Sequence, residues 1–240
     1  MTESPRLTDS ARREDLAARL AAVRERIAAA CEAAGRKPED VTLIAVTKTF
    51  PASDVRLLNG LGVTDFGENR DAEAAPKAEQ CADLDLVWHF IGQLQTNKAA
   101  SVVRYATFVH SVDRLRLVRA LGAGARRAGR VIQCLIEVSL DGDPARGGAP
   151  AGQVPGLAEA LTAEEGLVLA GVMTIAPLGV PPADAFAGLR DSTAVVRAVR
   201  PAATVISAGM SGDLEAAIAA GATHVRIGTA LLGDRGARVR

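Results

Sequence analysis

A lysine at the end of an apolar segment is a residue of this sequence that could do chemistry. Residues 41–47 (VTLIAVT) are apolar or β-branched, which is typical of a buried strand in a parallel sheet, and Lys48 follows them directly. In a partly desolvated site the pKa of an amine falls, and the amine becomes a nucleophile that can attack a carbonyl. The alternative is a lysine that simply extends from the core into water.

Two loops near the carboxyl end of the chain have the composition of an anion site. The first, SAGMSG, begins at Ser207 and includes Ser211, with glycines that let the backbone approach a ligand. Ser211 is also placed to cap a helix that begins at Asp213. The second loop contains Gly228 and Thr229, which offer backbone N–H groups and a hydroxyl. Such residues are ordinary turn formers as well, but both loops follow the last two expected strands, and this favours a phosphate site.

A phosphate site near a strand-end lysine suggests a ligand with a phosphate at one end and a carbonyl at the other. Pyridoxal 5′-phosphate (PLP) has both groups, and it forms a Schiff base with lysine. Arg226 lies two residues before Gly228, on the same face of its strand. Because arginine keeps its proton, Arg226 would leave the pyridine nitrogen unprotonated, which weakens the ring as an electron sink.

The elements that must position these residues alternate between strand and helix. Residues 10–34 have the spacing of an amphipathic helix, which precedes the first strand and so packs outside the repeat. The expected strands are 41–47, 63–66, 86–91, 107–110, 131–138, 167–173, 204–207 and 224–227. The expected helices between them are 52–61, 69–81, 94–103, 113–128, 151–163, 182–199 and 211–220.

Eight such units predict an α/β fold, a single (β/α)8 TIM barrel domain over residues 1–240 with the extra N-terminal helix 10–34 outside it. A doubly wound open sheet is the alternative. In a TIM barrel the loops that follow the strands meet at one end, which places Lys48 and both glycine-containing loops together.

The composition excludes several classes of partner. Lys+Arg and Asp+Glu both total 28, so a bulk electrostatic partner such as nucleic acid or an anionic membrane is not expected. The three cysteines form no CxxC pair and the three histidines show no metal-binding spacing, so neither a disulfide framework nor a metal site is predicted. No signal peptide or membrane-spanning segment is visible, and a cytoplasmic protein is expected.

Several segments match a known family in register over nearly the whole chain. They are AVTK (45–48), FGEN (66–69), WHFIGQLQTNK (88–98), Met173, SAGMSGDLEAAIAAG (207–221) and VRIGTALLG (225–233). These segments resemble the pyridoxal phosphate homeostasis protein family, the YggS/PROSC group, which is akin to the barrel domain of alanine racemase. Arg70, Ala208 and Gly212 depart from residues that are common in that family, which affects rim contacts more than cofactor binding.

The resemblance implies a PLP site and assigns its residues. Lys48 would carry the Schiff base, Arg226 would face the pyridine nitrogen, and His89 would stack on the ring. The phosphate would be held by Ser207 or Ser211, together with Gly228 and Thr229. The complete set implied is Lys48, Asn69, His89, Met173, Ser207, Ser211, Arg226, Gly228 and Thr229.

Two functions follow from such a site. The first is a PLP-binding protein of PLP homeostasis that holds, buffers or delivers PLP without substantial catalysis, with PLP-dependent apo-enzymes as transient partners and a monomer or weak dimer as its state. The alternative is a PLP-dependent amino-acid racemase or a related fold-type III enzyme. Two-base racemisation needs a second acid/base, and alanine racemases are known for taking a tyrosine from a second domain. The single tyrosine here, Tyr105, precedes the fourth strand and is expected near the barrel floor, which favours the carrier.

Overall fold

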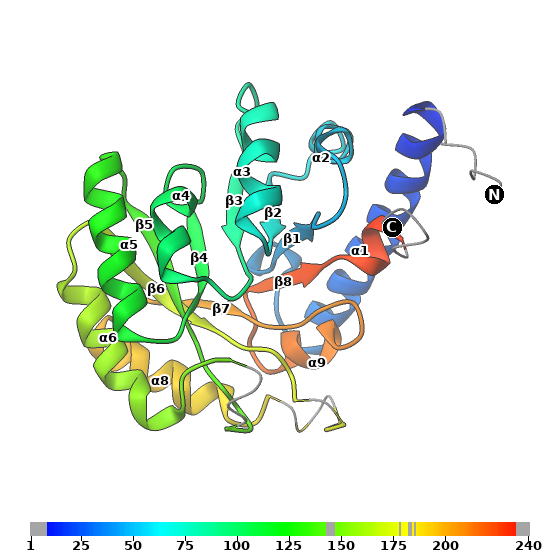
Figure 1. Ribbon diagram of the computed structural model, residues 1–240. Coiled ribbons are helices and arrows are strands. Elements are labelled where there is room, and N and C mark those ends of the chain that lie inside the picture. Colours follow the sequence, from blue (N-terminus) through cyan, green and yellow to red (C-terminus); the bar gives the residue numbers. More distant parts are fainter. Residues whose placement is uncertain (1–8, 143–146, 178, 182–183, 185, 234–240) are drawn as a thin grey trace.

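The strands of the protein close into a parallel barrel. The computed structural model describes residues 9–142, 147–177, 179–181, 184 and 186–233. Its strands are hydrogen-bonded in the cyclic order β1-β2-β3-β4-β5-β6-β7-β8, with helices around them (Figure 1). The prediction of a (β/α)8 TIM barrel is therefore confirmed, and the open sheet is excluded. The prediction of one domain over 1–240 includes residues outside the described ranges and stays a prediction.

The strands agree closely with the sequence pattern except at the second one. They are β1 (Thr42–Val46), β2 (Asp65–Glu68), β3 (Val87–Phe90), β4 (Phe108–Val112), β5 (Ile132–Glu137), β6 (Leu167–Met173), β7 (Val205–Ser207) and β8 (His224–Ile227). The predicted bounds 63–66 for the second strand are wrong by two residues. The amide of Val63 donates to the Leu58 carbonyl at 3.1 Å, so Val63 still belongs to the turn after the preceding helix.

The helices differ more from the prediction. They are α1 (Asp9–Ala33), α2 (Ala52–Asn59), α3 (Asp71–Gln80), α4 (Ala99–Val102), α5 (Leu115–Ala128), α6 (Val154–Ala163), α8 (Leu189–Val199), α9 (Leu214–Ala219) and α10 (Thr229–Leu232). The helix predicted over 94–103 is wrong in length, because a 3-10 turn occupies 96–98 before the short α4. Part of the helix predicted over 182–199 lies outside the described residues.

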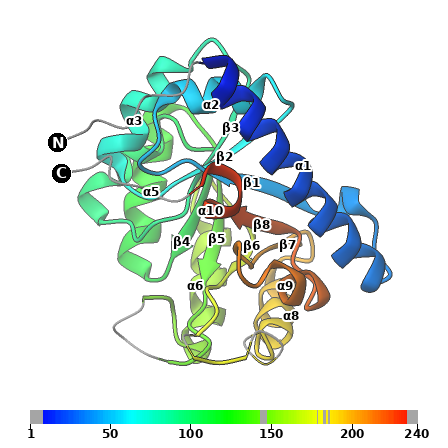
Figure 2. The same ribbon diagram turned by 90° about the vertical axis from the view of Figure 1, so that its right-hand side faces the viewer.

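The N-terminal helix packs on the outside of the barrel, as predicted. Its side chains Leu16, Leu20, Val23 and Ile27 are buried, and the helix contacts α2, α9 and α10 (Figure 2). Each such apolar side chain stabilises the packing by roughly 1.5–3 kcal/mol. Helix α1 therefore covers the seam where β1 and β8, the first and last strands, are paired.

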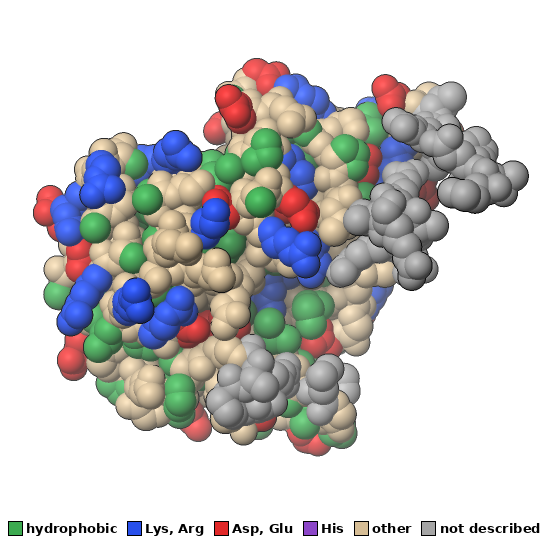
Figure 3. Space-filling view, in the orientation of Figure 1, with side chains coloured by type: hydrophobic (Ala, Val, Ile, Leu, Met, Phe, Trp, Pro, Cys, Tyr) green, Lys and Arg blue, Asp and Glu red, His purple; other side chains and the backbone are tan. Residues whose placement is uncertain are grey.

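The surface carries both signs of charge. On the face drawn in Figure 3, Lys and Arg side chains are interspersed with Asp and Glu, and no histidine is visible. Within the described residues, no helix combines the length and the apolar character that a membrane span requires.

Candidate functional site

The residue Lys48 follows β1 on a tight turn. The amide of Phe50 donates to the Thr47 carbonyl at 3.0 Å, and Thr49 has φ of +70°, which is a left-handed conformation. That conformation costs a β-branched residue on the order of 1–2 kcal/mol. The amide of Thr49 donates to Glu73 Oε2 at 3.0 Å, which helps to hold the turn. Lys48 thus leaves the strand, half-buried, on a fixed backbone.

A buried ion pair with its hydrogen bonds holds Thr47, the residue that precedes Lys48. Glu68 Oε1 accepts a hydrogen bond from Thr47 Oγ1 at 2.7 Å and forms an ion pair with Lys77, whose Nζ also donates to the Thr47 carbonyl at 2.8 Å. Burial raises the pKa of Glu68, and the ammonium group of Lys77 opposes that rise. The sequence reasoning gave Glu68 and Lys77 no role, since no local pattern connects them.

Arg226 lies on β8 inside the barrel and is 4% exposed. One terminal nitrogen of its guanidinium donates to Ser207 Oγ at 2.7 Å, and the other donates to the Thr174 carbonyl at 2.8 Å. Burial lowers the pKa of Arg226 to about 10, and the carboxyl groups of Glu137 and Asp213 oppose the effect. The guanidinium is therefore still charged at neutral pH, and it carries further N–H donors for a ligand.

The two candidate phosphate serines have different surroundings. The Ser207 hydroxyl is fully buried and lies 3.0 Å from His110 Nδ1 in addition to its bond from Arg226. The Ser211 hydroxyl is only partly buried and accepts a hydrogen bond from the Ala230 amide at 3.2 Å. Ser211 therefore lies against the segment that begins with Gly228 and Thr229, whereas Ser207 lies deeper in the barrel.

The prediction that Ser211 caps the following helix is wrong. Helix α9 begins at Leu214, and its N-cap residue is Asp213. The carboxylate of Asp213 accepts a hydrogen bond from the Met210 amide at 2.5 Å, and this closes the turn without the Ser211 side chain.

The residues expected to line the ring are spread over three strands. His89 is 1% exposed and stacks on Phe108, with ring centroids 4.7 Å apart and planes at 9°. Met173 ends β6 within an apolar cluster. Asn69 directly follows β2, and a Cβ added to Gly92 would lie 2.1 Å from the Asn69 carbonyl oxygen, so the loops after β2 and β3 are in close contact. Their contact with a cofactor stays a prediction.

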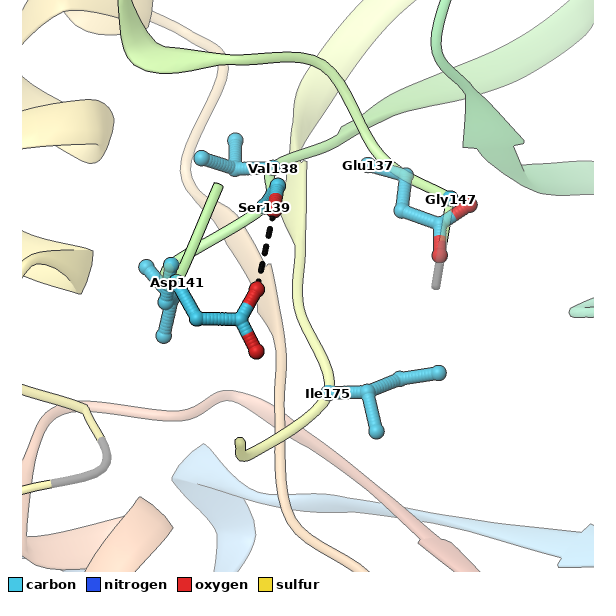
Figure 4. A pocket seen from close by; sticks show the side chains of 7 residues that line it. Glu137, Val138, Ser139, Asp141, Gly147 and Ile175 are labelled. Atoms are coloured by element: carbon cyan, nitrogen blue, oxygen red, sulfur yellow. Dashed lines mark hydrogen bonds between the residues drawn. The ribbon is translucent and has the colours of Figure 1, made fainter. Parts of the chain in front are cut away.

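An acidic residue that the sequence reasoning missed lies at the same end of the barrel. Glu137 ends β5, is 8% exposed, and lines a pocket with Ser139, Gly147 and Ile175 (Figure 4). Burial raises the pKa of Glu137 to about 7, helped by Asp113 and opposed by Arg226. A charged residue at the end of an apolar strand was the signal that identified Lys48, and the same signal would have identified Glu137.

The single tyrosine lies elsewhere than predicted. The Tyr105 hydroxyl donates to Asp71 Oδ1 over a long 3.5 Å. Asp71 is the first residue of α3, which follows β2, so the tyrosine hydroxyl reaches toward the site end of the helical layer instead of the floor. The floor placement was wrong because α4 is short and the tyrosine side chain is long. Burial next to Asp71 raises the pKa of Tyr105, so this hydroxyl stays protonated at neutral pH and does not supply a base.

A second cavity lies at the opposite end of the barrel, below α1. It is lined by Arg24, Ile27, Leu43, Thr64 and Asp65 among others, and by none of the predicted site residues. In the described part of the chain, no group of three or more His, Cys, Asp or Glu side chains is arranged to hold a metal ion. The chemistry-bearing residues therefore gather at the carboxyl ends of the strands, where TIM barrels carry their sites.

The donor set at this end fits PLP. An amine at the end of β1, a buried guanidinium on the paired strand β8, and a hydroxyl beside the Gly228–Thr229 segment match an aldehyde, a pyridine nitrogen and a phosphate. Comparison with known proteins agrees with this. A model of the alanine racemase N-terminal domain family matches residues 18–236.

Two curated relatives carry the name pyridoxal phosphate homeostasis protein. The one from Mycobacterium tuberculosis is 43% identical over 244 residues, which cover 93% of this chain and 94% of the relative. The one from Pseudomonas aeruginosa is 41% identical over 223 residues, covering 92% and 96%. The chain belongs to this family. The resemblance stated from its sequence motifs is thereby confirmed.

Solved structures agree with the family assignment. PipY of Synechococcus elongatus PCC7942, with PLP bound, is 36% identical and superposes with a TM-score of 0.80 over 91% of this chain and 100% of its own. A protein of unknown function from Bifidobacterium adolescentis is 31% identical, with a TM-score of 0.86 over 95% of this chain and 98% of its own. Alanine racemase of Corynebacterium glutamicum is 18% identical with a TM-score of 0.62, which shows a shared fold alone.

Proposed function

We propose that this member of the family binds PLP as a Schiff base on Lys48 and holds, buffers or delivers it without substantial catalysis. The observation that supports the proposal is the pairing of β1 with β8, because Lys48 follows the first of these strands and the buried Arg226 lies on the second. The names of the relatives and the PLP in PipY support it. A cytoplasmic location belongs to the same proposal, and the buried thiols of the three cysteines are consistent with it.

Each residue has a distinct part in this proposal. When bound, PLP supplies an aldehyde for the amine and a ring that can withdraw electrons. Lys48 is the covalent anchor, and Arg226 donates a hydrogen bond to the pyridine nitrogen. Ser211 contacts the phosphate together with Gly228 and Thr229, and we favour it over Ser207. The reason is that the Ser207 hydroxyl already bonds His110 and Arg226.

The racemase alternative has one observation in its favour. Glu137 is a buried carboxyl at the site end of the barrel, and its pKa of about 7 suits a general acid or base. The test is a screen of amino acids for D/L conversion and decarboxylation, comparing the natural protein with a Glu137→Gln variant. Turnover of about 1 s⁻¹ or more that the substitution removes would establish an enzyme and overturn the carrier.

The Schiff base is tested by borohydride reduction of protein loaded with PLP. The loaded protein should be yellow, and mass spectrometry of its reduced peptides should place the added pyridoxyl group on Lys48. The Lys48→Ala variant should lose the colour and the adduct. Lys98→Ala, which removes an exposed lysine in the 3-10 turn before α4, should keep both. An unchanged spectrum in Lys48→Ala would refute the assignment.

A further inference from the structure

A continuous chain of hydrogen bonds crosses the interior of the barrel. Its members come from β2, β3, β4, β7 and β8, five different strands. His89 Nε2 lies 2.9 Å from Asp65 Oδ1, and His89 Nδ1 lies 2.9 Å from His110 Nε2. His110 Nδ1 lies 3.0 Å from Ser207 Oγ, which accepts from Arg226 at 2.7 Å. Both imidazoles are thus bonded at both of their nitrogens.

The charge at the far end of the chain fixes the position of the first proton. Burial would raise the pKa of Asp65, but hydrogen bonds from His89 and Thr64 outweigh it and lower the pKa. Asp65 is therefore a carboxylate, which can only accept, so His89 Nε2 must donate to it. Burial lowers the pKa of His89, and its ring is neutral. A neutral imidazole with its proton on Nε2 has a bare Nδ1, which must accept from His110.

The remaining protons follow from the first. His110 donates from Nε2, and its pKa is well below the usual value because of burial, so this ring is also neutral. Its Nδ1 is therefore bare and accepts the Ser207 hydroxyl proton. The Ser207 oxygen in turn accepts an N–H of Arg226. Every bond thus points the same way, from the guanidinium to the carboxylate.

The chain gives the buried Arg226 guanidinium a hydrogen-bond partner in addition to the attraction of the Glu137 and Asp213 carboxyl groups. Among the described residues, Arg226 makes no ion pair with a carboxylate, although it is 4% exposed. A buried charge without compensation is costly. A chain of aligned donors that ends on Asp65 polarises each member in turn and makes the Ser207 oxygen a stronger acceptor. Asp65 itself is 19% exposed and lines the cavity below α1.

We propose that Asp65, His89, His110 and Ser207 are positioning residues, which act on the ligand through Arg226 by a one-directional hydrogen-bond chain. The direction of the chain is a property of the protein alone. Its effect on PLP rests on the function proposed above. The chain fixes the guanidinium in place and keeps its remaining donors oriented toward the mouth of the barrel. A purely structural network would have the same direction, but its disruption would not change the affinity or the spectrum of bound PLP.

The direction is tested without any cofactor by NMR of the ligand-free protein labelled with ¹⁵N-histidine. The sequence has 3 histidines, so three side chains give all the ring signals. Near neutral pH, His89 and His110 should each show a protonated Nε2 and a bare Nδ1. Ser207→Ala should shift the ring signals of His110, should shift those of His89 by a smaller amount, and should leave those of His224 unchanged. A proton on Nδ1 of either ring, or on both nitrogens, would overturn the chain.

The positioning role is tested with PLP, by affinity and absorbance spectrum. Asp65→Asn keeps the shape and an acceptor but removes the charge, and we expect PLP binding about tenfold weaker with a shifted spectrum, as for loss of a charge-assisted bond. His224→Asn removes a neighbouring histidine outside the chain and should leave both unchanged. If Asp65→Asn does not fold, His110→Asn cuts the chain at a residue that has no predicted contact with PLP.

The two experiments separate the possible failures. Natural protein that shows the expected tautomers but binds no PLP would refute the proposed function and leave the chain intact. PLP binding with an unchanged affinity and spectrum in Asp65→Asn would refute the positioning role.

Discussion

The two sides of the barrel interior are built in opposite ways. On the side of β2, β3 and β8, the inward side chains of Asp65, His89 and Arg226 are polar and hydrogen-bonded. On the side of β5 and β6, the inward side chains of Leu135, Ala170 and Met173 form an apolar cluster. Phe108 of β4 stands between them, packed against the apolar cluster and stacked on the His89 ring.

The two sides of the barrel interior therefore contribute differently: the apolar side contributes stability, and the polar side fixes the orientation of its groups. The apolar side gains stability from dispersion and from the removal of apolar surface from water, and these forces have little direction. The polar side contributes little net free energy of folding, because each hydrogen bond formed inside the barrel replaces hydrogen bonds that the same groups made to water. What it provides is a fixed orientation, since each hydrogen bond constrains the next. The side of the barrel nearest Lys48 is the one that carries this constraint.

Truncation of the apolar side should cost the most stability and leave the polar side unchanged. Leu135 is fully buried, and Leu135→Ala should lower the free energy of unfolding by about 2–5 kcal/mol, measured by urea denaturation. The histidine NMR signals should keep their tautomers. Ser207→Ala, the counterpart on the polar side, should cost about 1–3 kcal/mol and move those signals. Equal movement of the histidine signals in both variants would contradict the separation.

On the apolar side, β5 ends with the buried carboxyl group of Glu137, and removal of this carboxyl group should stabilise the protein at high pH. The pKa of Glu137 is raised from 4.5 to about 7, so the fold favours the protonated form. Its stabilising contribution is full below pH 4.5 and is lost as pH rises through 7. Glu137→Gln should therefore raise the free energy of unfolding at pH 8 by about 3 kcal/mol, with little change at pH 4.

A matched control is available for this substitution. Glu79→Gln replaces an exposed glutamate on α3 and should leave the pH profile of urea unfolding unchanged. If Glu137→Gln follows the natural protein at every pH, Glu137 is not held in its protonated form.

The sequence predicted what local patterns determine. The apolar strands predicted the barrel, the charged end of the first strand indicated Lys48, and the spacing from Gly228 indicated Arg226, since each of these signals lies within a few residues. The chain from Asp65 to Arg226 was not predictable, because its bonded members are separated by 19 to 97 residues and each alone resembles a core residue. Likewise, the sequence does not show that the Ser207 hydroxyl is buried and bonded to His110 and Arg226, whereas the Ser211 hydroxyl accepts from the Ala230 amide.

The smallest expected effect concerns His224, which lies on the polar side but outside the chain. Its ring centroid is 6.2 Å from that of His89, and its Nδ1 is 2.9 Å from Thr223 Oγ1. Burial, with His89, lowers the pKa of His224 from 6.5 to about 4. Between pH 6.5 and pH 4, the unfolded chain therefore binds a proton on this ring and the folded protein does not. The contribution of His224 to the free energy of unfolding is full above pH 6.5 and is lost as the pH falls toward 4.

His224 and Glu137 thus have opposite effects in the same pH range, and single substitutions should separate them. Asparagine at position 224 cannot take up a proton. Between pH 7 and pH 5, the loss of unfolding free energy should be about 2 kcal/mol smaller in His224→Asn than in the natural protein. In Glu137→Gln the loss should be larger by a similar amount, because the opposing slope of Glu137 is gone. Urea unfolding at the two pH values measures both, and the comparison uses the slope because removal of the ring also lowers stability at every pH. An unchanged slope in His224→Asn would show that this ring is not kept neutral by the polar side of the barrel.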